Sequence, residues 1–149
     1  MIMLCPHCWQ QVDRNAAVCL QCGGDLSSDA RDYLEKVITS LHHPDALTQR
    51  RAAYLLGLIG DARAVPVLID VLHDNGFDPF VRAQAAESLG ILGGPSAQPE
   101  LQAAASNPAE SVIVRASART ALATLSNNEN HTDAQSSNEG DHHAATVER

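Results

Sequence analysis

The chain has 149 residues, of which only 3% are aromatic, and it is rich in alanine and leucine. This composition favours helices packed through small side chains over a β-sandwich. Its formal net charge of −8 argues against nucleic acids and anionic membranes as partners, because both require clustered Lys and Arg. No apolar run approaches the roughly 18 residues of a membrane span, and the first residues lack the pattern of a signal peptide, so we expect a cytoplasmic protein.

Residues 1–27 form a cysteine-bearing head that is rich in turn-forming residues. Ten residues separate two C-x2-C pairs, Cys5 with Cys8 and Cys19 with Cys22. Two such turns facing each other supply four thiolates in a tetrahedron, which is the geometry of closed structural zinc sites. Because four thiolates leave no coordination position for water, we predict a structural Zn²⁺ ion rather than a catalytic one.

Several alternatives to this zinc site stay open. Iron occupies the same four-sulfur cage in rubredoxins and is the less favoured metal. Disulfides would require an oxidising compartment, and a redox-active C-x2-C would require a βαβ context that this sequence lacks. His7 lies inside the first turn and would be a ligand only by replacing a cysteine.

The head resembles the short zinc-ribbon family found at the ends of many bacterial multidomain proteins. The matching residues are Cys5-Pro6-His7-Cys8, Val12, Ala16, Cys19-Leu20-Gln21-Cys22-Gly23 and Leu26. After the first cysteine pair the family usually has Gly, where the backbone turns left-handed, and here the residue is Trp9. This substitution implies either strain or a different first turn. Trp9 is also a candidate partner-binding residue, and the alternative is that it covers the metal site as a lid.

Residues 28–126 repeat with a period of 33. The aligned positions include Asp45/Asp78/Ser111, Gln49/Arg82/Arg115, Leu56/Leu89/Leu122 and Ile59/Leu92/Leu125. Each unit has the pattern of two helices, with an Asp or Ser cap before the first and a Gly-containing break before the second. The predicted helices span 29–42, 46–59, 62–74, 79–92, 96–105 and 111–126.

The repeat resembles the HEAT-like repeats of phycobilin lyases and of many bacterial scaffold proteins, through residues 56–61, 64–68 and 81–93. This resemblance implies an all-α fold, a short α-solenoid of paired antiparallel helices behind the zinc ribbon. Gly57 and Gly90 are expected to let paired helices approach closely. The array is short, and its second unit has a poor second helix, so we expect marginal stability.

Two features of the repeats have alternative interpretations. Arg82 and Arg115 either form an exposed ladder for an acidic ligand, or each pairs with a nearby carboxylate such as Asp78 or Glu87. The apolar run 112–114 either packs internally or docks a partner. Residues 127–149 contain almost no large apolar side chains, and we predict that this tail is disordered.

No catalytic constellation is recognisable, since the chain lacks both G-x4-G-K and H-E-x2-H. We therefore expect a non-enzymatic protein–protein interaction module, an adaptor or scaffold, with no evident small-molecule substrate. The second helices line the concave face of such folds, and the candidate partner-binding residues there lie off the buried stripe of the helix at 62–74. They are Val67, Asp70, Val71 and Asp74.

Two further functions are weaker alternatives. The resemblance to phycobilin lyases implies an accessory role in attaching a tetrapyrrole to an acceptor protein. Nucleic-acid binding through the ribbon is disfavoured, because the head contains one arginine, Arg14, and no lysine.

Overall fold

The computed structural model describes residues 2–13, 15–26 and 33–136 of the chain. Its elements in order are β1 (Ile2–Leu4), β2 (Gln11–Asp13), α1 (Tyr33–Ser40), α2 (Ala46–Ile59), α3 (Ala64–His73), α4 (Pro79–Leu92), α5 (Ala97–Ser106) and α6 (Val112–Ser136). Each of the six predicted helices is present, although the predicted start of the first one, residues 29–32, lies outside the described residues.

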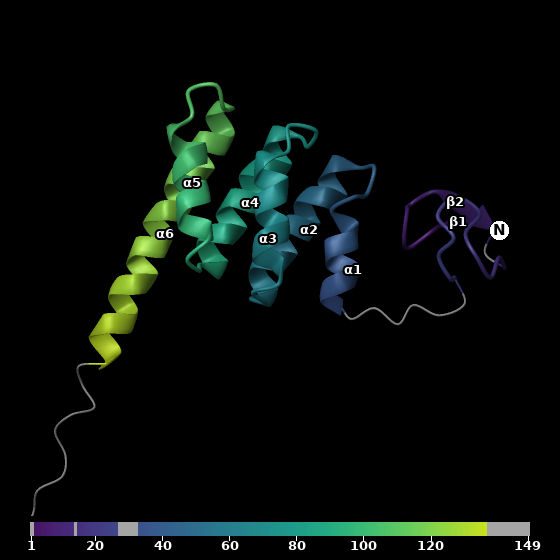
Figure 1. Cartoon of the computed structure of the whole chain (residues 1–149), viewed down its shortest axis with the longest axis horizontal. Coiled ribbons are helices and arrows are strands. Elements are labelled where there is room, and N and C mark those ends of the chain that lie inside the picture. Colours follow the sequence, from purple (N-terminus) through teal and green to yellow (C-terminus); the bar gives the residue numbers. More distant parts are fainter. Residues whose placement is uncertain (1, 14, 27–32, 137–149) are drawn as a thin grey trace, which may run out of the picture.

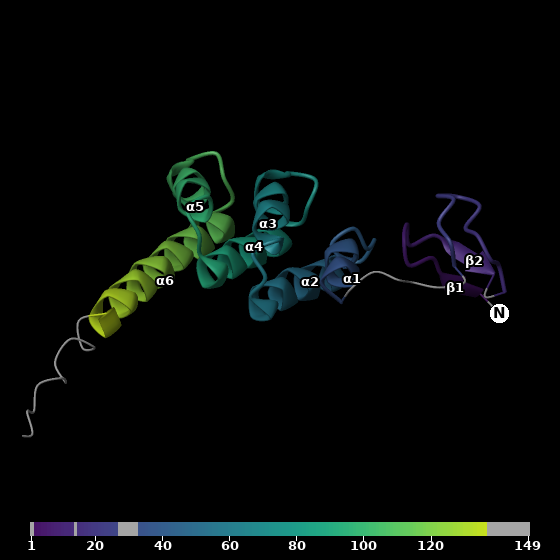
Figure 2. The same cartoon turned by 60° about the horizontal axis from the view of Figure 1, so that its bottom comes forward.

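The helices stack in two layers (Figures 1 and 2). α2, α4 and α6 pack side by side in one layer, and α3 and α5 lie together in the other, where α1 also contacts α3. This arrangement confirms the short α-solenoid of paired helices. None of the helices within the described ranges has the length and apolar character needed to cross a membrane.

The predicted caps explain where two of the first-layer helices begin. The carboxylate of Asp45 accepts a hydrogen bond from the Thr48 backbone N–H at 2.9 Å, and that of Asp78 accepts one from Phe80 at 2.8 Å. Pro79 occupies the first turn of α4, where its missing N–H costs nothing. Capping by the repeated aspartates therefore sets the register of α2 and α4.

Close approach between first-layer helices depends on small residues, as predicted. A Cβ atom on Gly57 would lie 2.8 Å from Ser88 Oγ, and one on Gly90 would lie 2.7 Å from Ala121 Cα. Ser88 itself is fully buried and donates to the Ala53 carbonyl at 2.8 Å. Larger side chains at these glycines would push the helices apart.

The C-terminal part of the array differs from the prediction in three ways. α5 packs well in spite of its weak pattern, because Leu101 and three alanines bury one face: Ala97, Ala104 and Ala105. The apolar run at the start of α6 is split, with Val114 fully buried and Val112 72% exposed. α6 also continues to Ser136, within the segment predicted to be disordered. A helix anchored by packing extends at little cost, since only nucleation is strongly unfavourable.

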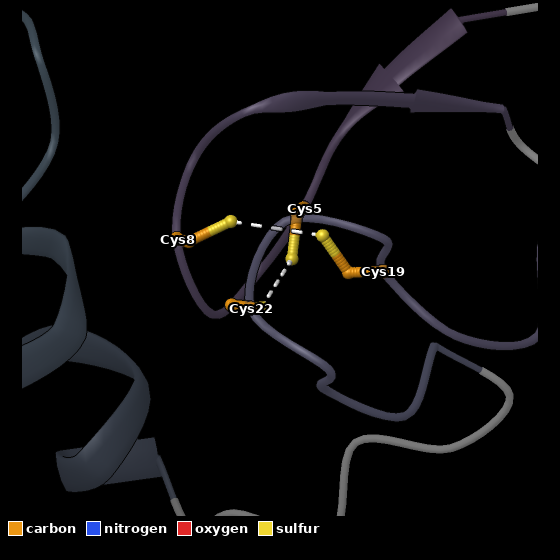
Figure 3. Close-up of side chains that lie close together, drawn as sticks. All are labelled: Cys5, Cys8, Cys19 and Cys22. Atoms are coloured by element: carbon orange, nitrogen blue, oxygen red, sulfur yellow. Dashed lines mark hydrogen bonds between the residues drawn. The ribbon is translucent and has the colours of Figure 1, made fainter.

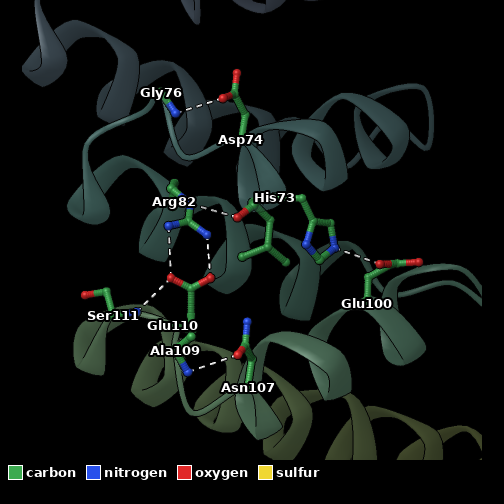
Figure 4. A network of polar contacts seen from close by, with 10 residues as sticks. His73, Asp74, Gly76, Arg82, Glu100, Asn107, Ala109, Glu110 and Ser111 are labelled. Carbon is green, nitrogen blue, oxygen red and sulfur yellow. Dashed lines mark hydrogen bonds and ion pairs between the residues drawn. The ribbon is translucent and has the colours of Figure 1, made fainter.

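A buried ion pair joins α4 to the turn before α6 (Figure 4). Arg82 Nε donates to the Leu72 carbonyl at 2.8 Å, Nη1 donates to Glu110 Oε1 at 2.9 Å, and Nη2 donates to Glu110 Oε2. The side chains of Arg82 and Glu110 are only 6% and 9% exposed. The expectation that Arg82 pairs with a carboxylate is thus right, but the partner is neither Asp78 nor Glu87.

The same pair determines the protonation of Glu110. Burial alone would raise the pKa of Glu110, but hydrogen bonds from Arg82 and from the Ser111 backbone N–H outweigh it and lower this pKa below its ordinary value. The stabilisation is therefore fully present above the ordinary carboxyl pKa and is lost as the pH falls through the lowered value of the folded state.

Substituting Arg82→Gln is expected to lower the free energy of unfolding by about 3 kcal/mol near neutral pH, because it leaves a buried carboxylate without its partner. The control Arg63→Gln breaks an exposed pair with Asp61 and should cost less than about 1 kcal/mol. Chemical denaturation measures both, and the effect of Arg82→Gln should shrink in acid. Equal losses in the two variants would contradict this account.

Candidate metal centre

The two cysteine pairs lie on two turns with the same backbone geometry. In the first turn the N–H of Trp9 donates to the Cys5 carbonyl at 2.9 Å, and in the second that of Gly23 donates to Cys19 at 2.8 Å. Both closing residues are left-handed, with φ of 62° for Trp9 and 72° for Gly23. The strained alternative for Trp9 is therefore the one observed, at a cost of about 1–3 kcal/mol that the surrounding contacts must offset.

Short backbone pairings hold these turns opposite each other. β1 pairs antiparallel with β2, with Met3 opposite Val12, and this hairpin carries the first turn. An isolated bridge between Val18 and Asp25 frames the second turn. Because each pairing fixes the residues that flank a cysteine pair, the chain needs few apolar contacts to aim the sulfurs.

The four sulfur atoms lie around a common centre (Figure 3). Cys5 Sγ lies 3.8 Å from Cys22 Sγ, Cys8 Sγ lies 3.7 Å from Cys19 Sγ, and all four lie within 4.8 Å of one another. A tetrahedron with metal–sulfur bonds of about 2.3 Å has edges of about 3.8 Å. The donor set and its spacing therefore fit a single metal ion, and all four cysteines are free thiols rather than disulfides.

The electrostatics of the thiols favour a bound cation. Backbone N–H groups of Cys22 and Gln21 lower the pKa of Cys19 to about 6. Although the backbone N–H of Gln10 favours the Cys8 thiolate, burial and the three neighbouring thiols together raise the pKa of Cys8 to about 12. The first negative charge is stabilised locally and opposes the next one, so full ionisation of the cluster requires a compensating positive charge.

His7 is placed outside this sulfur cluster. Its backbone N–H lies 3.4 Å from Cys5 Sγ, in a position to stabilise a thiolate. Its ring Nε2 lies 3.0 Å from the Asp25 carbonyl oxygen, so the imidazole bridges to the second turn instead. The geometry gives His7 a supporting position, and the four-cysteine set needs no replacement.

Trp9 joins the head to the helical array. Its indole Nε1–H donates to the Thr39 carbonyl at 3.1 Å, near the end of α1, and its ring meets that of His43 edge-on with centroids 4.8 Å apart. These anchoring contacts lie within the chain. That Trp9 also covers the metal site as a lid stays a prediction.

The four candidate partner-binding residues of α3 line one cavity of about 400 Å³. Asp70 and Asp74 are exposed, Val67 is half-buried, and Val71 is only 3% exposed. The expectation that Val71 lies off the buried stripe is thus wrong, because α1 packs against α3 and widens the buried face. The cavity nevertheless brings together all four residues.

Sequence reasoning missed the rest of the cavity wall, which includes Leu41, His42, His73 and Phe77. Leu41 and His42 follow α1, whereas Phe77 belongs to the turn between α3 and α4. The repeat alignment gives a partial signal, because a residue at the end of one second helix is expected to lie beside the next one. That alignment does not place turn residues, since turns vary in shape between repeats.

Comparisons with known proteins agree with the helical part of this description. A family model of HEAT repeats matches residues 34–123. Mouse deoxyhypusine hydroxylase is 41% identical over 51 residues, which cover 34% of this chain and 17% of the enzyme. The structure of human deoxyhypusine hydroxylase in complex with glycerol superposes with a TM-score of 0.62 at 32% identity, covering 66% of this chain and 34% of that one.

These relatives correct one expectation and refine another. Both relatives are deoxyhypusine hydroxylase, which is an enzyme, and this finding contradicts the expectation that the chain is not an enzyme. The chain spans well under half the length of either relative, so the match concerns the repeats rather than the whole enzyme. HEAT repeats are confirmed, whereas the phycobilin-lyase type stays a prediction.

Trp9 is the only tryptophan, so its fluorescence reports directly on the contact between head and array. His43→Ala is expected to shift the Trp9 emission to longer wavelength, because the indole loses a ring that shields it and gains contact with water. His42→Ala removes an exposed imidazole one residue away and should leave the emission unchanged. Identical spectra for the two variants would show that the indole does not contact His43 in solution.

Proposed function

Because the chain belongs to the HEAT-repeat family, we propose that it is a protein-interaction module whose metal-stabilised head is joined to a short helical array. The observation that carries this proposal is the cavity between α1 and α3, which unites the four candidate residues of α3. HEAT arrays bury their repeats against one another and leave their helical faces for other molecules.

The chemistry of the cavity favours a basic segment of a partner protein. Val67, Val71 and Phe77 provide an apolar wall, and the carboxylates of Asp70 and Asp74 stand beside it. Asp74 also caps the C-terminal end of α3, where the unpaired carbonyls add partial negative charge. A Lys or Arg side chain has an apolar stem for such a wall and a cationic head for such carboxylates.

An imidazole group, that of His73, also lines this cavity. His73 Nε2 lies 2.7 Å from Glu100 Oε2 across α3 and α5, and both side chains are about 40% exposed (Figure 4). This contact holds the His73 ring on the side of α5. Because Asp74 Oδ1 already accepts from the Gly76 backbone N–H at 2.8 Å, the acidic groups left for a partner are the Asp70 carboxylate and Asp74 Oδ2. The field at the cavity is therefore negative overall.

For the head, we infer that the ion is Zn²⁺ in a purely structural role. Four thiolates in a closed tetrahedron match structural zinc sites, and iron is the alternative with the same ligands. A reducing compartment such as the cytoplasm would keep the thiols available for metal. With so little apolar core in residues 1–27, the metal would supply the folding free energy of the head.

The similarity to deoxyhypusine hydroxylase supports a second candidate, a repeat unit within an enzyme of that type. Mass spectrometry of a deoxyhypusine-containing protein incubated with the chain would detect the added oxygen atom. The relatives named here give no support to a tetrapyrrole-attachment role, which rests on the repeat resemblance alone.

Purified protein is expected to contain one zinc ion per chain by elemental analysis, and Co²⁺ substitution should give the strong visible bands of a tetrahedral thiolate site. Cys19→Ser should lose the ion, because it removes a buried ligand. His7→Ala should keep it, since His7 is not in the sulfur cluster. Iron in the protein as isolated, or metal loss in His7→Ala, would overturn this assignment.

An amphipathic peptide of lysine and leucine is expected to bind the chain more tightly than the same peptide with acetylated lysines. The double variant Asp70→Asn with Asp74→Asn should weaken binding about tenfold by calorimetry, because two charge-assisted hydrogen bonds are lost. The control Glu139→Gln with Asp141→Asn removes the same charge from the tail. If both double variants bind equally, only the net charge of the chain attracts the peptide.

A further inference from the structure

The repeat period relates the buried Arg82 to a second arginine at the end of the array. Arg115 is its counterpart 33 residues later, in the first turns of α6 as Arg82 is in those of α4. Arg82 satisfies its Nε with the Leu72 carbonyl and its two Nη groups with Glu110. Repeat symmetry therefore predicts which groups an arginine at this position binds: a carbonyl at the end of the preceding repeat's second helix and a carboxylate from the turn before the next repeat.

Arg115 has neither of these partners among the described residues. Its Nε is shielded from solvent and makes no hydrogen bond there. The counterpart of the Leu72 carbonyl is that of Ala105, and it accepts instead from Arg119 Nη2 at 3.5 Å. The counterpart of Glu110 is position 143, which is a histidine outside the described residues. The Nη groups of Arg115, whose counterparts on Arg82 bind Glu110, therefore lack a carboxylate within the described residues.

The helix face beside Arg115 is the counterpart of the α4 face that packs against α6. Gly90 meets Ala121 of α6 on that face of α4, and Ala83 and Ala86 are buried two turns and one turn before Gly90. Their counterparts on α6 are Ala116, Arg119 and Ala123, and all three are exposed. Ala116 keeps the small size of its counterpart, but Ala123 has the Cβ atom that Gly90 lacks and Arg119 replaces an alanine, so a docked helix would lie farther from α6 than α6 lies from α4. The middle one adds a positive charge.

We propose that this edge of α6 docks a helix of another protein whose N-terminal turn carries a carboxylate, with Arg115 binding that carboxylate as Arg82 binds Glu110. Charge supports this partner, because the chain is acidic overall at −8 while the edge presents Arg115 and Arg119. The pairing is bidentate and charge-assisted, so it selects for a carboxylate in one orientation. The surface is separate from the cavity between α1 and α3.

The chain itself provides the probe for this surface. Residues 107–126 contain the Glu110 turn and the part of α6 that packs on α4, so a synthetic peptide of that segment should dock on α6 with its Glu110 at Arg115. Its binding to the full chain is followed by fluorescence anisotropy at low ionic strength. The Arg115 Nε–H resonance is followed by NMR. A shift of this resonance shows that the peptide binds at the edge of α6 and has not instead displaced α6 from Arg82.

The wild-type peptide should bind and shift the Arg115 resonance. The Glu110→Gln peptide, and separately the Arg115→Gln protein, should each bind about tenfold more weakly, and combining them should cause no further loss. The control protein Arg63→Gln removes the same charge and should bind as wild type. Absence of binding, an unshifted Arg115 resonance, or equal losses in Arg115→Gln and Arg63→Gln would each overturn the proposal.

Discussion

The constraint on which this structure depends is that a pair of short helices cannot bury both of its edges by itself. α4 illustrates the solution, since it is buried on one side by α2 and on the other by α6. Gly57 and Gly90 permit the two approaches, and the Arg82–Glu110 pair joins α4 to the turn before α6. The two ends of the array differ from α4, because each end has an edge that lacks a second neighbouring helix among the described residues.

The two ends differ in the groups that they present. At the N-terminal end the cysteine-bearing head contacts the end of α1 and the turn after it, through Trp9 against Thr39 and His43. Trp9 is also the left-handed residue that closes the first cysteine turn, so the sulfur cluster and the position of the head depend on one backbone conformation. At the C-terminal end α6 keeps the arginine of an internal repeat as Arg115 and has a second arginine, Arg119.

Much of the fold could be predicted from the sequence because it depends on local signals and on one repeat period. The caps Asp45 and Asp78 mark helix starts through their local sequence alone. Two C-x2-C turns likewise bring four sulfurs together with little contribution from the rest of the chain. The partner of Arg82 could not be predicted, because Glu110 lies 28 residues away in a turn that the 33-residue alignment does not constrain. The contacts of Trp9 could not be predicted for a similar reason, since they cross from the head to the helices.

The two proposed surfaces differ in charge, and they should therefore bind different partners. The cavity by α3 offers Asp70, Asp74 and a helix C-terminus, while the edge of α6 offers two arginines beside small residues. A basic segment gains attraction at the first surface and meets repulsion at the second, and an acidic helix start behaves in the opposite way. At an ionic strength of about 0.1 M, charges more than about 10 Å apart are largely screened, so each surface attracts or repels only groups close to it. On these two proposals, one short array would hold two chemically different segments at once, which a single charged face could not do.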